Sequence, residues 1–141
     1  MSDIVKTLHY DVDPKDFDSV GEASGKTKNV LRQLGFPPEV LRRVAIAMYE
    51  GEINMVIHAN GGTADVEISP KQIKITLKDN GPGIPDIEKA MQKGYSTASE
   101  EARSLGFGAG MGLFNMDTYA DELNITTKIG VGTTVEMIIR T

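Results

Sequence analysis

The chain reads Lys78-Asp79-Asn80-Gly81-Pro82-Gly83-Ile84-Pro85 at the point where a strand-like run gives way to a turn rich in glycine and proline. The alternating apolar residues Ile73, Ile75 and Leu77 predict a strand that ends at Asp79. Folds commonly place a binding residue at the end of a central strand. We therefore interpret Asp79 as a candidate binding side chain, carried into a turn by Gly81 and Gly83.

A second glycine cluster, Gly106-Phe107-Gly108-Ala109-Gly110-Met111-Gly112, precedes a helix that we expect to start near 109–111 and to end near Tyr119. Glycines let backbone N–H groups approach an anion, and a helix N-terminus adds a positive partial charge. The cluster therefore suggests a phosphate cradle. It does not match the dinucleotide-binding fingerprint and no strand directly precedes it, so a flexible surface loop remains the alternative.

An unusually apolar helix, predicted from Pro38 to about Ala59, carries Glu50, Glu52 and Asn54. At ~100° per residue, Glu50 and Asn54 lie about 40° apart on one face, whereas Glu52 points away from Glu50 by about 160°. A carboxylate and an amide on a largely buried helix are costly without partners. The helix alone leaves two interpretations open: a functional pair, or a pair that bonds to a neighbouring loop.

The whole chain of 141 residues, with 40% apolar and 25% charged residues, is expected to form one domain, 1–141. Its net charge of −5 argues against nucleic acid as the main partner. The chain has no cysteine, which excludes disulfides and zinc–thiolate sites. Neither a signal peptide nor an apolar run of the ~20 residues that span a membrane is recognisable. We expect a cytoplasmic protein.

The expected element order is β-α-α-β-β-(lid)-α-β-β, which indicates an α/β two-layer sandwich with a mixed, mostly antiparallel sheet. The first helix is expected to begin at Pro14, capped by Asp13, and to end near Leu34 before Gly35. The remaining expected elements are strands around 4–12, 66–68, 73–77, 123–127 and 135–139, a short helix over 85–94, and an aperiodic, mobile lid over 94–110.

One stretch, Gly21-Glu22-Ala23-Ser24-Gly25-Lys26-Thr27, imitates a phosphate-binding P-loop. It has one residue too few between its glycines, and it falls within a predicted helix where a P-loop links a strand to a helix. We interpret it as a solvated part of that helix.

Four pieces occur in the order of the GHKL ATP-binding family: Glu50-x-x-x-Asn54, Asp79-x-Gly81-x-Gly83, the glycine cluster at 106–112, and Gly130-x-Gly132-Thr133. The chain resembles this family over nearly its whole length. Within the family it is similar to the anti-sigma-factor and stressosome switch serine/threonine kinases of bacterial partner-switching modules. The resemblance implies the Bergerat-type ATP-binding fold, with helices on one face of the sheet and a mobile ATP lid.

The resemblance also implies roles for single residues. Asp79 would accept a hydrogen bond from the adenine amino group, with Thr133 supporting that end of the pocket and Gly81 and Gly83 letting the backbone pass close to the base. Asn54 would coordinate Mg²⁺. Glu50 would be the general base. The β- and γ-phosphates would be held by Gly106, Gly108, Gly110, Met111 and Gly112. His58 would reach a phosphate or be a packed histidine.

Three residues depart from the pattern of the related kinases: Tyr49 is bulky before the glutamate, and Gly51 and Glu52 are unusual after it. The resemblance implies a kinase that uses ATP and Mg²⁺ and phosphorylates a small STAS-domain-like protein. A nucleotide-gated binding module for a sigma factor or a phosphatase is the alternative, and a simple ATPase or an excised histidine-kinase domain is a third. A homodimer remains open.

Overall fold

The computed structural model describes residues 4–13, 20–58, 61–81 and 112–141. Within these ranges the elements follow the predicted order, with the predicted lid and short helix lying outside the described residues. The elements are β1 Lys6–Val12, α1 Glu22–Gln33, α2 Pro38–His58, β2 Gly62–Ile68, β3 Gln72–Asp79, α5 Gly112–Tyr119, β4 Glu122–Lys128 and β5 Gly132–Arg140.

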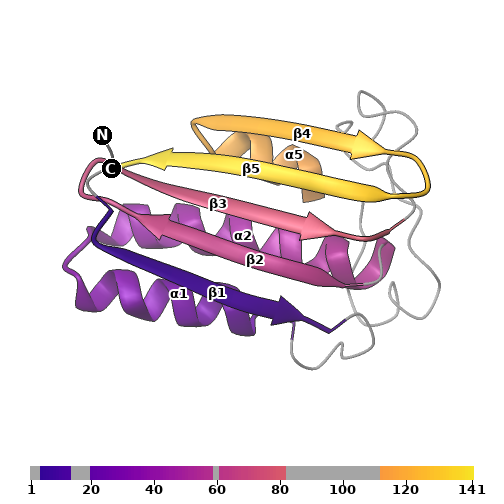
Figure 1. The fold of residues 1–141 in the computed structure, drawn as a ribbon. Coiled ribbons are helices and arrows are strands. Elements are labelled where there is room, and N and C mark those ends of the chain that lie inside the picture. The colour runs from indigo at the N-terminus through magenta and orange to yellow at the C-terminus, as the bar shows by residue number, and fades with distance from the viewer. Residues whose placement is uncertain (1–3, 14–19, 59–60, 82–111) are drawn as a thin grey trace.

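The strands form one five-stranded sheet in the order β1-β2-β3-β5-β4. Every pairing among the described strands is antiparallel, so the sheet lacks the parallel contact that a mixed sheet would contain. The register places Gly62 opposite Asp79 and Lys78 opposite Thr134. As a result, the end of β3 and the starts of β2 and β5 meet at one end of the sheet (Figure 1).

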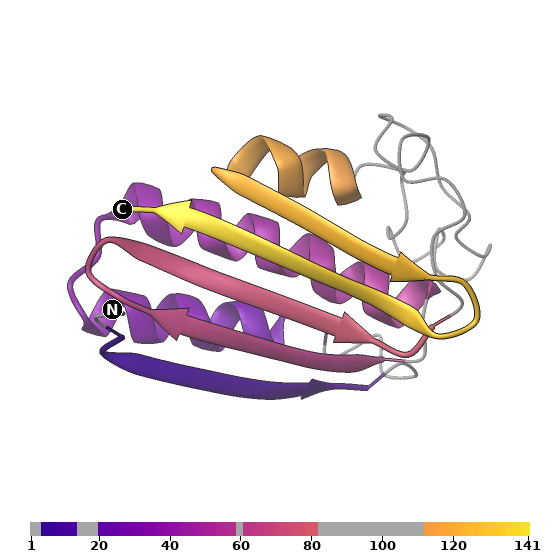
Figure 2. The same ribbon diagram turned by 45° about the horizontal axis from the view of Figure 1, so that its top comes forward.

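The three described helices cover one face of the sheet, which gives the predicted two-layer sandwich (Figures 1 and 2). Helix α2 lies between α1 and α5 and packs against both. It also contacts the central strands β3 and β5. None of the helices in the described ranges is long and apolar enough to cross a membrane.

The core lies between these layers because the strands alternate inward apolar and outward polar residues. Val66, Ile75 and Met137 of the sheet and Val44 and Met48 of α2 are fully buried. Each such side chain contributes about 1.5–3 kcal/mol relative to an exposed position. The buried residues Val44 and Met48 thus anchor the part of α2 that leads directly into Glu50.

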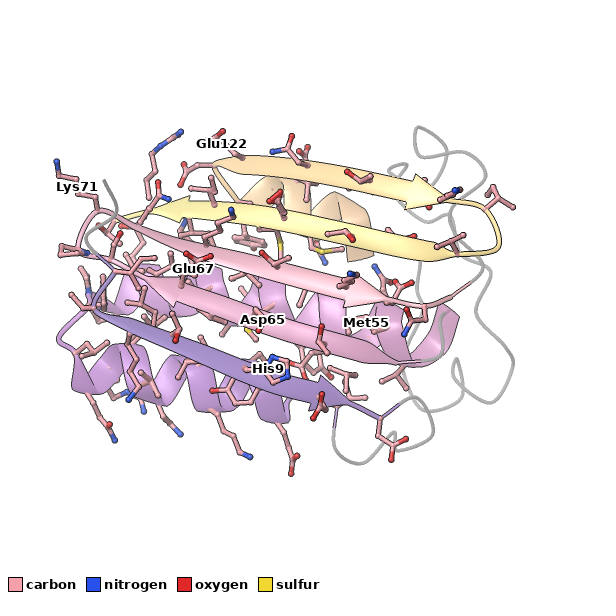
Figure 3. All side chains as sticks on the ribbon, in the orientation of Figure 1. His9, Met55, Asp65, Glu67, Lys71 and Glu122 are labelled. Atoms are coloured by element: carbon pink, nitrogen blue, oxygen red, sulfur yellow. The ribbon has the colours of Figure 1, made fainter. Side chains whose placement is uncertain are left out.

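The outer face of the sheet carries polar side chains, as Figure 3 shows for His9, Asp65 and Glu67. His9 of β1 stands opposite Asp65 of β2. Their Nδ1 and Oδ1 atoms lie 2.6 Å apart, and His9 Nε2 lies 3.5 Å from Asp11 Oδ1. Both carboxylates raise the pKa of His9, with the hydrogen bond and charge of Asp65 as the larger cause.

The first helix begins later than predicted, at Glu22, with Gly21 as its N-cap at φ 101°. The prediction of a helix from Pro14 capped by Asp13 is wrong for residues 20–21, which form a turn; residues 14–19 lie outside the described ranges. Its end near Leu34 and Gly35 is confirmed. The described part of α5 covers Gly112–Tyr119, which confirms the predicted end at Tyr119; the predicted start near 109–111 lies outside the described residues.

Candidate functional site

Asp79 ends β3 and is held there by two backbone groups. Its Oδ1 atom accepts hydrogen bonds from the Gly81 N–H at 2.9 Å and from the Thr133 N–H at 3.0 Å. Two donors on one oxygen fix the plane of the carboxylate. Among the described residues no hydrogen bond reaches Oδ2, so the carboxylate can accept a further bond from an amino group at this end of the sheet.

Thr133 forms the neighbouring wall of the site and is only 5% exposed. It follows Gly132 at the start of β5, and its Oγ1 lies 2.9 Å from Thr127 Oγ1 on the paired strand β4. Gly132 adopts φ 151°, and a Cβ there would overlap the Asp79 carbonyl oxygen. Glycine at this position therefore lets β5 approach the end of β3, which brings the Thr133 N–H to the Asp79 carboxylate.

Glu50 lies on α2 and is partly buried. Its Oε1 accepts a hydrogen bond from Nδ2 of Asn115 on α5, at 3.2 Å. Asn54 follows one helical turn later, also partly buried, on the face that Glu50 occupies. A carboxylate and an amide oxygen thus stand in sequence along the part of α2 that leads toward the Asp79 end of the sheet (Figure 1).

Gly51 joins this part of α2 to the strand that carries Asp79. A Cβ on Gly51 would overlap Cδ1 of Leu77 in β3, two residues before Asp79, and would lie 3.7 Å from Sδ of Met116 in α5. A Cβ at this position would force the Leu77 side chain to move. The departure at Gly51 is therefore explained by packing: it seats the Glu50 turn directly on β3.

Glu52 points to the opposite side and is buried, with 2% exposure. Its carboxylate accepts hydrogen bonds from three N–H groups at the start of α1: Gly21 at 3.0 Å, Ala23 at 3.3 Å and Ser24 at 2.7 Å. An anion at a helix N-terminus satisfies its free donors and its dipole. Glu52 therefore caps α1 from another helix.

The P-loop-like stretch 21–27 is this same helix start. Residues 22–27 are helical, as predicted, and the backbone donors of the first turn face the Glu52 carboxylate. The side chains of Ser24 and Thr27 are buried and bond to backbone carbonyls within α1. The prediction that this part of the helix is solvated holds only for its exposed side. The backbone donors at the helix start are already bound to the Glu52 carboxylate.

Tyr49, the bulky residue before Glu50, packs beside the same helix start: its ring atom Cε1 would lie 3.1 Å from a Cβ on Gly21. Burial raises the pKa of Tyr49, and the charges of Glu50 and Glu52 raise it further. The phenol therefore stays protonated through the physiological range. The structure thus gives Tyr49 a packing role against α1.

Several predicted site residues lie outside the described part of the chain: Gly83, Gly106, Gly108, Gly110 and Met111. Gly112 is described as the first residue of α5. The side chain of His58, the last residue of α2, also lies outside the description. The structure brings Asp79, Gly81 and Thr133 into direct contact and places Glu50 and Asn54 on the adjoining helix.

Sequence reasoning missed Asn115, Thr127 and the partner of Glu52. Asn115 carried one signal, because it is an amide within the largely apolar run Gly112-Leu113-Phe114-Asn115-Met116 that follows the glycine cluster. The sequence around Glu52 gives no signal for its hydrogen-bond partner. Its donors lie 28 to 31 residues earlier in the chain.

A family model described as a histidine kinase-like ATPase domain matches residues 14–139. Among curated proteins, the serine/threonine-protein kinase RsbT of Bacillus subtilis (strain 168) is 33% identical over 115 residues, covering 79% of this chain and 80% of that protein. The anti-sigma F factor of Thermoanaerobacter sp. (strain X514) is 38% identical over 104 residues, covering 70% of this chain and 69% of that protein.

Solved structures show the same fold at low sequence identity. The RsbU and RsbW domains of Rv1364c from Mycobacterium tuberculosis match with a TM-score of 0.65 at 15% identity, over 96% of this chain and 32% of that one. The SiaB–SiaC complex from Pseudomonas aeruginosa matches with a TM-score of 0.63 at 13% identity, over 98% of this chain and 90% of that one.

Proposed function

This chain belongs to the histidine kinase-like ATPase family, and on that premise we propose that the end of the sheet around Asp79 is its ATP site. The chain is an ATP-dependent serine/threonine kinase of the partner-switching type, as the names of its relatives indicate. The observation that carries the site assignment is the Asp79 carboxylate, whose Oδ1 is fixed by two backbone N–H groups.

In this proposal Asp79 recognises adenine. The base presents an exocyclic amino group, and a carboxylate held in a fixed plane is a directional acceptor for it. Thr133 supports the same end of the pocket, directly or through a water molecule. Gly81 and Gly83 keep the backbone close to the base. The chemistry of the set fits adenine because it offers an anionic acceptor beside a small, buried threonine.

The phosphates and the metal ion are assigned to the other side of the site. Gly106, Gly108, Gly110 and Met111 with Gly112 at the start of α5 hold the β- and γ-phosphates through backbone N–H groups. Asn54 fits Mg²⁺ because its amide oxygen is a hard ligand on the helix face shared with Glu50. When bound, Mg²⁺ supplies charge neutralisation for the phosphate oxygens.

Glu50 acts as the general base. A serine or threonine hydroxyl of the partner attacks the γ-phosphorus, and the bond between that phosphorus and the bridging oxygen of ADP breaks. The hydroxyl proton passes to the Glu50 carboxylate. Asn115 donates a hydrogen bond to Oε1 of Glu50. Among the described residues no hydrogen bond reaches Oε2, and we assign Oε2 as the atom that accepts the proton.

The partner is a small STAS-domain-like protein, and the reaction takes place in the cytoplasm. The relatives named anti-sigma F factor favour a second function. In that function the chain, as a nucleotide-gated binding module, sequesters a sigma factor or a phosphatase with or without phosphotransfer. A homodimer is compatible with both functions.

The experiment that tests the kinase site measures phosphotransfer and ATP affinity together. We expect Glu50→Gln to keep ATP affinity within about twofold and to lower phosphotransfer about 10²–10⁴-fold, the usual contribution of a general base. Glu39→Gln, in the exposed first turn of α2, is the control and should leave both unchanged. Full phosphotransfer by Glu50→Gln would overturn the base assignment.

A further inference from the structure

Helix α5 contacts the candidate base through a side chain that has no assigned role. Asn115 Nδ2 donates to Glu50 Oε1 at 3.2 Å, across 65 positions of the sequence. Both side chains are partly buried, at the contact between α2 and α5. The bond is therefore a link between two helices in a partly shielded place.

The neighbouring residues keep this link in register. Met116, directly after Asn115, is fully buried and faces Gly51, directly after Glu50, with Sδ 3.7 Å from a Cβ placed there. Two consecutive residues of α5 thus meet two consecutive residues of α2. Met116 is within ordinary contact distance of this position and is fully buried, so the position of Asn115 relative to Glu50 is set by core packing.

An amide suits this position chemically. A glutamate side chain has several rotatable bonds, and a base works best when its free oxygen is held at the attacking hydroxyl. A neutral N–H donor orients one oxygen and adds no charge of its own. A lysine or arginine in its place would pair with the carboxylate and weaken it as a base.

We propose that Asn115 is a positioning residue for Glu50. The position of α5 then determines whether the Glu50 carboxylate is oriented toward the attacking hydroxyl. The inference rests on the proposed role of Glu50. Helix α5 begins at Gly112, at the end of the glycine cluster assigned to the phosphates. The helix that starts at the phosphates thereby also orients the group that takes the proton.

The test is a double-mutant cycle between Asn115→Leu and Glu50→Gln, read by phosphotransfer rate and by calorimetric ATP affinity. Asn115→Leu keeps the side-chain size and removes the donor. We expect kcat to fall about tenfold, the effect of a misaligned base, while ATP affinity and the KM for the partner stay within about twofold. In the Glu50→Gln background the same change should lower kcat no further, because the two residues act as a unit.

Three further variants sharpen the cycle. Asn115→Gln restores an amide donor and should recover part of the rate, whereas Asp117→Asn, on the exposed side of α5, should leave it unchanged. Asn115→Ser removes the amide without adding apolar bulk and repeats the test if Asn115→Leu does not fold.

The outcomes separate the two proposals. An unchanged kcat in Asn115→Leu, with Glu50→Gln inactive, would overturn the positioning role and leave the base assignment standing. An equal loss in both backgrounds, or a parallel loss of ATP affinity, would also overturn it in favour of a purely structural role. A fully active Glu50→Gln would remove the base assignment itself.

Discussion

Three consecutive residues of α2, Glu50, Gly51 and Glu52, each face a different element. Glu50 accepts from Asn115 of α5, Gly51 lies against Leu77 of β3, and Glu52 accepts from the first turn of α1. The sequence departures at Gly51 and Glu52 therefore follow from packing and capping. One turn of one helix fixes the candidate base relative to both the strand of Asp79 and the helices on either side.

His9 gives a residue-scale prediction on the outer face of the sheet. Asp65 chiefly raises its pKa, so His9 is protonated more readily in the folded than in the unfolded protein. The resulting stabilisation is fully present below about pH 6.5 and is lost as pH rises through the raised folded-state pKa. Asp65→Asn should therefore lower the free energy of unfolding more at pH 5.5 than at pH 8.5, as measured by urea titration.

The control for this pair is Glu67→Gln, on the same strand and the same face. The change in the free energy of unfolding caused by Glu67→Gln should not depend on the protonation of His9. Proton NMR should also show a lower His9 pKa in Asp65→Asn. The same loss of stability at both pH values would contradict the pairing.

At the scale of elements, α1 depends on α2 for its beginning. Its N-cap is Gly21, which offers no side-chain cap, and the acceptor for its first N–H groups is Glu52. Helices usually take such an acceptor from the residue at their own start. Here the cap comes from another helix, so α1 and α2 are joined by a buried carboxylate as well as by apolar packing.

Removing this carboxylate should cost stability. Glu52→Ala leaves buried N–H groups of α1 without an acceptor, and we expect it to lower the free energy of unfolding by about 3 kcal/mol. The measurement is urea unfolding at pH 7. Glu22→Gln, at an exposed position in the first turn of α1, is the matched control and should cost less than about 1 kcal/mol.

A loss in Glu52→Ala no larger than in Glu22→Gln would show that α1 needs no acceptor from α2.

Local patterns in the sequence predicted most elements correctly. The Pro38–His58 helix and the β2–β3 hairpin follow from apolar periodicity and turn residues. The placement of the helices on one face of the sheet was implied by the family resemblance (Figure 2). Asp79 was singled out by its place at the end of a predicted strand and Thr133 through the family resemblance, and their contact joins positions 54 residues apart. Periodicity cannot pair such residues.

The errors have one physical origin. The predicted helix does not continue through residues 20–21, which form a turn, and α1 begins at Glu22, where Glu52 supplies the acceptor from elsewhere in the chain. Asn115 likewise meets its partner Glu50 only when α5 packs on α2. Contacts made by tertiary packing override local signals, and no window of sequence contains both partners.

At the scale of the whole molecule, the antiparallel sheet and the central helix bring the candidate site residues toward one end. Asp79 ends β3, Thr133 is the second residue of β5, and Gly51 packs the Glu50 turn against Leu77 of β3. The carboxylate proposed to bind adenine lies at the end of β3, and the proposed base lies on the turn of α2 that packs against β3. The central claim is that this end of the sheet binds ATP through Asp79.

The most direct test of that claim is calorimetric titration with ATP and Mg²⁺ of the wild type and of Asp79→Asn, with unfolding curves to show that both are folded. We predict that the wild type binds and that Asp79→Asn loses binding by about tenfold or more, because the amide replaces the anionic acceptor of the adenine amino group. Equal affinity in the two folded proteins would contradict the assignment of the site to Asp79.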